Sequence, residues 1–261
     1  MRIGIIGDGA IARFVRDKAS DYGHDVGAQL LRPSRAAERQ RENIACVSSV
    51  DDLPGDIEHM VDCAGHSALR DYGPDILRGG RNLTTVSIGA LADQQLYDEL
   101  DQAAADGASR LHLASGAIGA LDCLRAARVG ALHSVTYTGR KPPLGWKGSP
   151  AESRLDLDAL TTGEHVHFEG TARFAAIEYP KNANVAAAVA LAGVGFDDTT
   201  VQLIADASVT ENIHQVRASG EFGSFSFEIR GKSLPDHPKS SALAAMSVLS
   251  KLEDVSQRIV F

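Results

Sequence analysis

The sequence of 261 residues contains only three cysteines, Cys46, Cys63 and Cys123. Their number is odd and no two stand at C-x-x-C spacing, which argues against a disulfide framework and against a thiolate metal site. His165 and His167 alternate on one face if the chain is extended there, but no carboxylate or third histidine stands at ligand spacing. We therefore expect no metal site, and a reducing cytoplasm suits the chain best.

Positive charge is also scarce, because 26 Lys and Arg residues face 34 Asp and Glu residues, for a net charge of -8. Nucleic acid or an anionic membrane would meet a repulsive field over most of such a surface. No window reaches the roughly 18 uninterrupted apolar residues of a membrane-spanning helix, and no export signal is expected at the N-terminus. We expect no nucleic-acid or membrane partner, and any anionic substrate must be held by local cations.

Apolar residues make up 44% of the chain, which is enough for a sizeable core. From residue 2 to about residue 115, short apolar or β-branched runs alternate with longer amphipathic runs, as expected of βαβ units on a parallel sheet. A short helix and an edge strand are expected in the irregular segment between the second and third of these runs. Strands are predicted at 2–7, 25–31, 59–65, 82–89 and 110–115, and helices at 10–23, 67–80 and 92–107.

The alternation stops after residue 115, which predicts a dinucleotide-binding domain over 1–115 and a smaller α+β catalytic and dimerisation domain over 116–239. The segment 240–261 is amphipathic through Leu243, Met246, Leu249 and Leu252, and we expect this helix to pack back on the first domain. Trp146 lies in a loop rich in Pro and Gly, and we interpret it as a loop anchor, with a lid residue as the alternative. In the second domain, helices are predicted at 117–130, 171–180 and 183–193, and strands at 132–141, 199–209, 213–222 and 224–232.

The segment RIGIIGDGAIA places Gly7, Gly9 and Ala12 in a G-x-G-x-x-A pattern between a predicted strand and a predicted helix. The first glycine permits the tight turn, the second leaves room for a pyrophosphate, and the small third residue keeps helix and strand close. The amides of the helix start, which includes Ala10 and Ile11, are expected to bind the phosphates. The pattern predicts a Rossmann-type doubly wound parallel sheet and a nicotinamide dinucleotide cofactor.

Arg32 and Arg35 follow the second predicted strand, where an NAD site usually offers a carboxylate to the ribose hydroxyls. A guanidinium would instead pair with the 2′-phosphate of NADP. We therefore expect NADP to be favoured over NAD, without NAD being excluded; solvated surface charges are the alternative interpretation.

Six stretches resemble the L-aspartate dehydrogenase family in order and over essentially the whole length. They are GDGAIA, SIGAL at 87–91, SGAIGALD at 115–122, PKNANVAA at 180–187, NIH at 212–214 and HPKSSAL at 237–243. The chain departs from the family pattern at Ala12 and Ala120, which replace glycines, and at Gln215, where an acidic residue often follows the histidine.

The resemblance implies a two-domain enzyme, often a homodimer, that oxidises L-aspartate to iminoaspartate with NAD or NADP. The imine then hydrolyses to oxaloacetate and ammonia in aspartate catabolism or enters nicotinamide biosynthesis. By matching positions, His214 is the catalytic histidine, while Ala117 and Asn184 are cofactor contacts. Histidine also suits the chemistry, because a hydride leaves an amino-bearing carbon only after the amine has lost its extra proton.

Other residues are candidate substrate or cofactor contacts because they lie beside these motifs. A dicarboxylate substrate needs cations, and Lys181 and Lys239 are the first candidates, with Arg140 or Lys141 as further choices. Asn182 is a candidate substrate contact, and Asn184 is placed either to cap a helix or to reach the nicotinamide ribose or carboxamide. Ser87 and His66 follow predicted strands at the edge where ligands bind, so they are expected near substrate and nicotinamide respectively.

Two other functions remain open. A dihydrodipicolinate-reductase-like imine or keto reductase shares the two-domain plan, but its paired histidines followed by lysine and its PSGTA-like stretch are not seen here. A non-enzymatic regulator that senses nucleotide would need a DNA-binding or interaction face, and no basic helix is visible.

Overall fold

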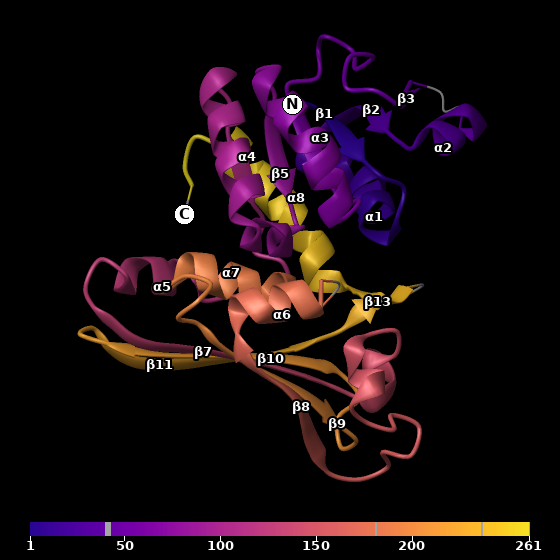
Figure 1. Cartoon of the computed structure of the whole chain (residues 1–261). Coiled ribbons are helices and arrows are strands. Elements are labelled where there is room, and N and C mark those ends of the chain that lie inside the picture. The colour runs from indigo at the N-terminus through magenta and orange to yellow at the C-terminus, as the bar shows by residue number, and fades with distance from the viewer. Residues whose placement is uncertain (40–42, 181, 236, 261) are drawn as a thin grey trace. The chain divides into compact units, whose positions relative to one another are not determined.

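The computed structural model describes residues 1–39, 43–180, 182–235 and 237–260, except the side chains of residues 238 and 239. The chain forms two compact units (Figure 1). Unit 1 comprises Met1–Ala114 and Ala244–Phe261, and unit 2 comprises Ser115–Leu243. Within the described ranges, no helix is both long and apolar enough to span a lipid bilayer.

Unit 1 is built on a six-stranded parallel sheet with the order β3-β2-β1-β4-β5-β6, which confirms the doubly wound fold expected from the alternating runs. The strand order reverses between β1 and β4, and ligands of such sheets bind beyond the carboxyl ends of the strands at that point. The strands are β1 (Arg2–Ile6), β2 (Asp25–Leu30), β3 (Ala45–Val47), β4 (His59–Asp62), β5 (Asn82–Thr85) and β6 (Leu111–Leu113).

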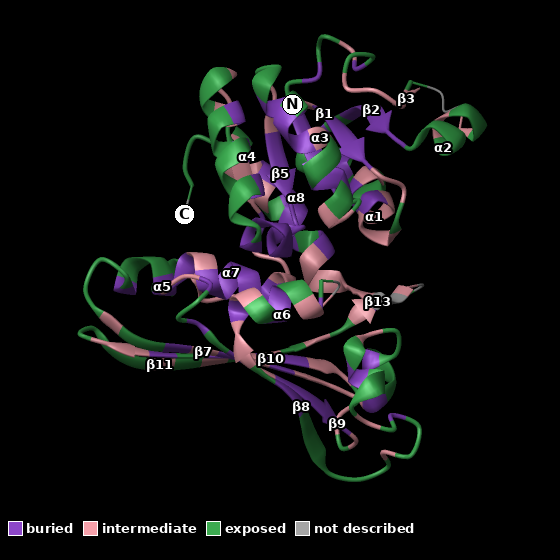
Figure 2. Ribbon diagram, in the orientation of Figure 1, coloured by how far each residue is buried: buried purple, intermediate pink, exposed green. Residues whose placement is uncertain are grey.

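Helices cover both faces of this sheet, so that its strands are buried on both sides (Figure 2). On one face, Gly4, Met60 and Leu83 are paired neighbours, and Gly73 of α3 lies close to Leu83 and to Leu100 of α4. The helices of the unit are α1 (Ala10–Lys18), α2 (Pro33–Glu38), α3 (His66–Arg78), α4 (Gln94–Asp106) and α8 (Ala242–Ser256), with 3-10 turns η1 (Ala19–Tyr22) and η2 (Ile88–Ala92).

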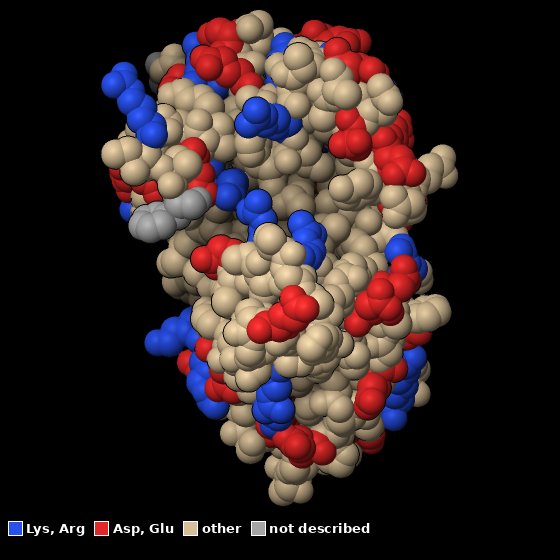
Figure 3. Space-filling model, turned by 90° about the vertical axis from the view of Figure 1, so that its left-hand side faces the viewer, with Lys and Arg blue, Asp and Glu red and all other residues tan. Residues whose placement is uncertain are grey.

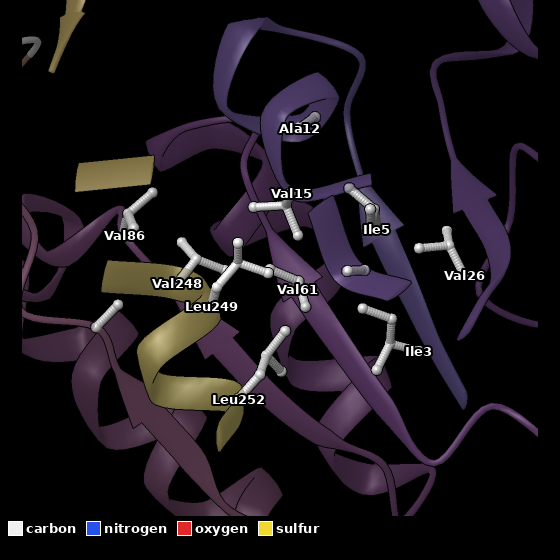
Figure 4. Close-up of a cluster of buried hydrophobic side chains, with 12 residues drawn as sticks. Ile3, Ile5, Ala12, Val15, Val26, Val61, Val86, Val248, Leu249 and Leu252 are labelled. Atoms are coloured by element: carbon white, nitrogen blue, oxygen red, sulfur yellow. The ribbon is translucent and has the colours of Figure 1, made fainter. Parts of the chain in front are cut away.

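The opposite face carries the core that joins the two ends of the chain. Ile3 and Ile5 of β1 and Val15 of α1 form one cluster with Val248, Leu249 and Leu252 of α8 (Figure 4). Burying one such side chain contributes about 1.5–3 kcal/mol, so α8 is an integral layer of unit 1. Met246 belongs to the predicted apolar stripe of this helix but is 49% exposed, and the neighbouring Ala245 is buried in its place.

Unit 2 contains a five-stranded mixed sheet with the order β11-β10-β7-β9-β8, in which only β7 and β9 run parallel. Its helices α5, α6 and α7 lie over one face of the sheet (Figure 1). The strands are β7 (Leu132–Lys141), β8 (Glu164–Thr171), β9 (Thr200–Asp206), β10 (Asn212–Gly220) and β11 (Gly223–Gly231). The helices are α5 (Leu121–Ala127), α6 (Ala172–Glu178) and α7 (Asn184–Ala192), with 3-10 turns η3 (Pro143–Trp146) and η4 (Pro150–Ser153).

Three details of the predicted elements are wrong. Strand β5 ends at Thr85, and the SIGAL segment forms the turn η2 instead of continuing the strand. Helix α5 begins only at Leu121, since Gly116 has φ +70° and Ala120 has φ +61°, both left-handed conformations that interrupt a helix. Strand β8 and the small hairpin of β12 (Ser233–Leu234) with β13 (His237–Ser241) were not expected.

Charge is mixed on the molecular surface. On the face shown in Figure 3, lysine and arginine side chains are interspersed with aspartate and glutamate side chains, and uncharged residues cover most of the area. Several described pairs are close enough for ion pairs, such as Lys147 with Asp158 and Arg173 with Asp197. Exposed pairs of this kind contribute little to stability, typically about 0–1 kcal/mol each.

Candidate active site

The nucleotide turn follows β1 in unit 1. Gly7 has φ +96°, and a Cβ atom there would lie 2.8 Å from the Cβ of Ala64, so the turn requires glycine. A Cβ atom on Gly9, in contrast, would meet nothing within 4 Å and would point into open space. Gly9 is the N-cap of α1, which has no side-chain cap and no acidic residue in its first turn. The turn therefore leaves the start of α1, with Ala10 and Ile11, open to an anionic group.

A cavity of about 670 Å³ adjoins this turn. It is the right size for an extended ligand, since such sites span about 300–1,000 Å³. Arg32 and Arg35 line it and are exposed, and Arg35 Nη1 lies 3.7 Å from Glu38 Oε2. Two further arginines, Arg13 and Arg39, also line it. The small, open turn and these cations fit a nicotinamide dinucleotide.

Ala12 does not line the cavity. It is fully buried and packs in the same apolar cluster as Ile3 and Ile5. Its small side chain lets α1 approach β1 closely, which is the role expected of the third position in the pattern.

Ser87 is buried in unit 1, where its hydroxyl donates a hydrogen bond of 2.5 Å to Asp62 Oδ2. Thr85 donates a second bond of 2.7 Å to the same oxygen, and burial raises the pKa of Asp62. The observed role of Ser87 is thus to hold the end of β4, while contact with substrate remains a prediction. His66 begins α3 after Gly65, and the neighbouring Ser67 lines the cavity.

In unit 2, His214 lies on β10 opposite Gly139 of β7. Its Nδ1 is 2.8 Å from the Tyr137 hydroxyl oxygen, and both side chains are buried. A Cβ atom on Gly139 would lie 2.7 Å from that hydroxyl, so glycine leaves the room that the pair needs. Burial, and secondarily the charge of Lys141, lowers the pKa of His214 to about 4, and the imidazole is therefore neutral at pH 7.

Lys141 lies two residues beyond Gly139 on β7, so Tyr137, Gly139 and Lys141 share one face of the strand with the facing His214. Its Nζ donates a hydrogen bond of 2.7 Å to Asn182 Oδ1 and lies 4.6 Å from the centre of the Trp146 ring. Burial lowers the pKa of Lys141 to about 8. We call Tyr137, Lys141, Trp146, Asn182 and His214 the Lys141 cluster.

A second aromatic group supports the Lys141 cluster. Trp146 is 1% exposed and donates from Nε1 to the Ile204 carbonyl at 2.9 Å, which agrees with its interpretation as an anchor. The His167 ring packs edge-on against the Trp146 ring, with 4.4 Å between the ring centres. Its Nδ1 is 3.1 Å from the Tyr179 hydroxyl oxygen. Burial, then Arg154 and Lys141, lowers the pKa of His167 to about 4. No group of three or more metal-ligating side chains occurs in the part of the chain described.

The remaining candidates also belong to unit 2. Asn182 contacts Lys141, whereas Lys181 lies outside the described residues and only the backbone of Lys239 is described, in β13. Asn184 is the first residue of α7, whose N-cap is Ala183, so the capping interpretation of Asn184 is wrong. Ala117 is 7% exposed, in the turn before α5.

Sequence reasoning missed Tyr137 altogether and ranked Lys141 below two other lysines. The available signal was the alternation in LHSVTYTGRK, which places a tyrosine and a lysine on the face that a strand in an α+β unit buries. Their partners could not be read locally, because Asn182 is 41 residues from Lys141 and His214 is 77 residues from Tyr137.

Two family models match consecutive parts of the chain. Residues 3–114 match the homoserine dehydrogenase NAD-binding domain, and residues 122–255 match the C-terminal domain of aspartate dehydrogenase. An L-aspartate dehydrogenase of Ruegeria pomeroyi is 52% identical over 97% of this chain and 91% of its own length. The chain belongs to the aspartate dehydrogenase family.

Two further relatives agree with this membership. The L-aspartate dehydrogenase of Cupriavidus necator is 44% identical over 97% of this chain and 96% of its own length. The crystal structure of aspartate dehydrogenase from Thermotoga maritima has a TM-score of 0.75 and 29% identity, covering 100% of this chain and 99% of the other. Membership in this family makes the protein an oxidoreductase with a nicotinamide cofactor.

Proposed function

We propose that the protein oxidises L-aspartate to iminoaspartate with NAD or NADP, after which water converts the imine to oxaloacetate and ammonium. The observation that carries the proposal is the Lys141 cluster, in which a neutral His214 and a cationic Lys141 share one face of the unit 2 sheet. An amino acid substrate needs both functions, a proton acceptor for its ammonium group and a cation for carboxylate. Family membership supports the same reaction.

His214 would take the proton that must leave the ammonium group before hydride departs from Cα. A base at Nε2 requires the tautomer in which Nδ1 carries hydrogen and donates it to the Tyr137 hydroxyl oxygen, and we assign that tautomer. The low pKa of His214 keeps this base unprotonated in the free protein, although it also weakens the base. Tyr137 would therefore position His214.

The cofactor would supply the hydride acceptor, and the residues that would hold it are those of the nucleotide turn. Gly7, Gly9 and the start of α1 would receive the pyrophosphate. His66, Ala117 and Asn184 remain proposed contacts of the nicotinamide half.

The preference for NADP is also part of the proposal. Arg32 and Arg35 line the cavity beyond β2, and Arg32 stands just after the strand, where NAD sites usually carry a carboxylate. Arg39 lies in the same cavity but is paired with Asp8 at 2.6 Å. One charge-assisted contact with a 2′-phosphate contributes about 1.5–3 kcal/mol, which corresponds to roughly ten- to a hundredfold in affinity.

Nicotinamide reduction with L-aspartate, D-aspartate, L-alanine and L-glutamate, each with NAD and with NADP, tests the proposal. We expect reduction with L-aspartate at a rate well above the other three. Reduction with none of them would favour a nucleotide-sensing protein, and oxidation of NADPH by a cyclic imine without L-aspartate activity would favour the imine reductase.

We also propose an oligomeric state, a cellular compartment and a metabolic use of the product. We propose a homodimer, and light scattering would then give twice the chain mass of 27.6 kDa. The three cysteines are free thiols in the structure, which is compatible with the cytoplasm. Supply of iminoaspartate to nicotinamide biosynthesis is the proposed use of the product, with aspartate catabolism as the alternative.

A further inference from the structure

Lys141 has unusual partners for a lysine in a partly buried position. Its ammonium group contacts the neutral amide oxygen of Asn182 and the face of Trp146. In the portion of the chain that the structure describes, no carboxylate forms an ion pair with it, and the only cause of its lowered pKa is burial.

Neighbouring cations of unit 2 are neutralised within the protein. Arg140, the preceding residue, pairs with Asp206 at 2.7 Å and also with Glu164. Lys147 pairs with Asp158 at 2.5 Å. Among the described residues of this unit, these carboxylates therefore pair with Arg140 and Lys147, and none is found in an ion pair with Lys141.

Removing a cation from water without a counter-ion is costly, and one amide oxygen and one ring offset only part of that cost. The unsatisfied charge therefore favours an anionic ligand. We propose that Lys141 binds a carboxylate group of the substrate, with Asn182 and Trp146 holding the ammonium group in position.

This inference rests on the proposed function and assigns its carboxylate site. The position is suitable because Lys141 and His214 lie on the same sheet face, near enough for Lys141 to lower the pKa of His214. An anion on Lys141 would offset that effect and make His214 a stronger base when substrate is present. Carboxylate binding and proton acceptance would thus be coupled.

Trp146 provides a direct measurement, because it is the single tryptophan of the chain and its ring lies against Lys141. Succinate, a dicarboxylate without an amino group, is titrated while Trp146 fluorescence is recorded, both without cofactor and with saturating NADP. We expect a saturable change and a Kd about ten- to a hundredfold higher in Lys141→Met. Lys147→Met, which removes an exposed lysine nearby, should bind succinate like the unchanged protein.

The pH dependence of succinate binding gives a second readout. The described titratable groups around Lys141 do not change their protonation state between about pH 6 and 9. His214 and His167 have pKa values of about 4 and burial raises the pKa of Tyr137, so all three stay neutral. Affinity should therefore fall as pH rises through about 8, where Lys141 loses its proton. Lys141→Arg should retain its affinity at higher pH, because a guanidinium stays charged.

Kinetics with L-aspartate and L-asparagine identify which carboxylate is bound. If Lys141→Met reduces the preference for L-aspartate, Lys141 binds the side-chain carboxylate; an equal loss of kcat/KM on both substrates assigns the α-carboxylate. Either result supports the proposal.

The proposal is overturned if succinate gives no saturable change under either condition, or if Lys141→Met, folded by circular dichroism, binds succinate as the unchanged protein does. Succinate binding that depends on Lys141 in a protein without L-aspartate turnover would reject the proposed function and leave the carboxylate site standing.

Discussion

The nucleotide turn of unit 1 and the Lys141 cluster of unit 2 present polar groups in opposite ways. The turn offers open backbone at Gly9 and exposed cations at Arg32 and Arg35. The cluster places its groups among buried neighbours, where burial lowers the pKa of His214 to about 4 and that of Lys141 to about 8. Exposed charges adjust affinity modestly, whereas buried groups have their acid-base properties set by their surroundings.

Of the variants that test this comparison, His214→Ala has the largest expected effect. We expect turnover with L-aspartate to fall by roughly 10²–10⁴-fold, because the proposed proton acceptor is lost. Cofactor affinity, measured by fluorescence of bound NADPH, should not change if the two regions act separately. His133→Ala, an exposed histidine on β7, is the matched control. Near-normal turnover in His214→Ala would remove the histidine from the mechanism.

Tyr137→Phe tests whether the cluster depends on positioning. The change leaves Nδ1 of His214 without its hydroxyl partner, at a cost of about 1–3 kcal/mol, so kcat should fall roughly tenfold or more. The Kd for succinate should stay constant, because Tyr137 acts through His214. Tyr97→Phe, at an exposed tyrosine, serves as the control. An unchanged kcat would show that the hydroxyl does not position the base.

The exposed cations of the turn are tested by replacing Arg32 and Arg35 with alanine together. The ratio of kcat/KM for NADP to that for NAD should fall about ten- to a hundredfold, while kcat with saturating cofactor changes little. Arg110→Ala provides an exposed arginine of the same unit as control. A constant ratio would assign both arginines to the solvated surface.

The smallest expected effect concerns Ala120, where this chain departs from the glycine of the family pattern. Its φ of +61° is unfavourable for alanine, so Ala120→Gly should raise the free energy of unfolding by about 0.5–1 kcal/mol. Denaturant unfolding measures the change. Ala126→Gly, on the exposed side of α5, should lower stability by a similar amount. A loss of stability in Ala120→Gly would contradict the strain argument.

The same contrast explains how much of the fold could be predicted. Unit 1 repeats a local pattern of apolar strand and amphipathic helix, and that pattern predicted the doubly wound parallel sheet that the structure shows. In β8, the register shifts between Val166 and Phe168, so His167 does not follow the simple alternation that would have indicated a strand. Left-handed backbone at Ala120 likewise gave no signal, since alanine ordinarily favours helix.

The residues of the candidate site also differ in how far the sequence alone predicts them. Gly7, Gly9 and Ala12 lie within six consecutive residues, and their roles follow from backbone geometry. His214 was predicted from the family resemblance, but its partner Tyr137 required the pairing of β10 with β7. Lys141 became the leading cation only when its partners were known, because an unpaired charge is a property of the folded surroundings.

The most direct measurement is reduction of NAD and NADP by the purified protein with L-aspartate, beside His214→Ala under the same conditions. The account predicts L-aspartate-dependent reduction with at least one cofactor, and its loss in His214→Ala. Absence of reduction with both cofactors, or equal reduction by the two proteins, would contradict it.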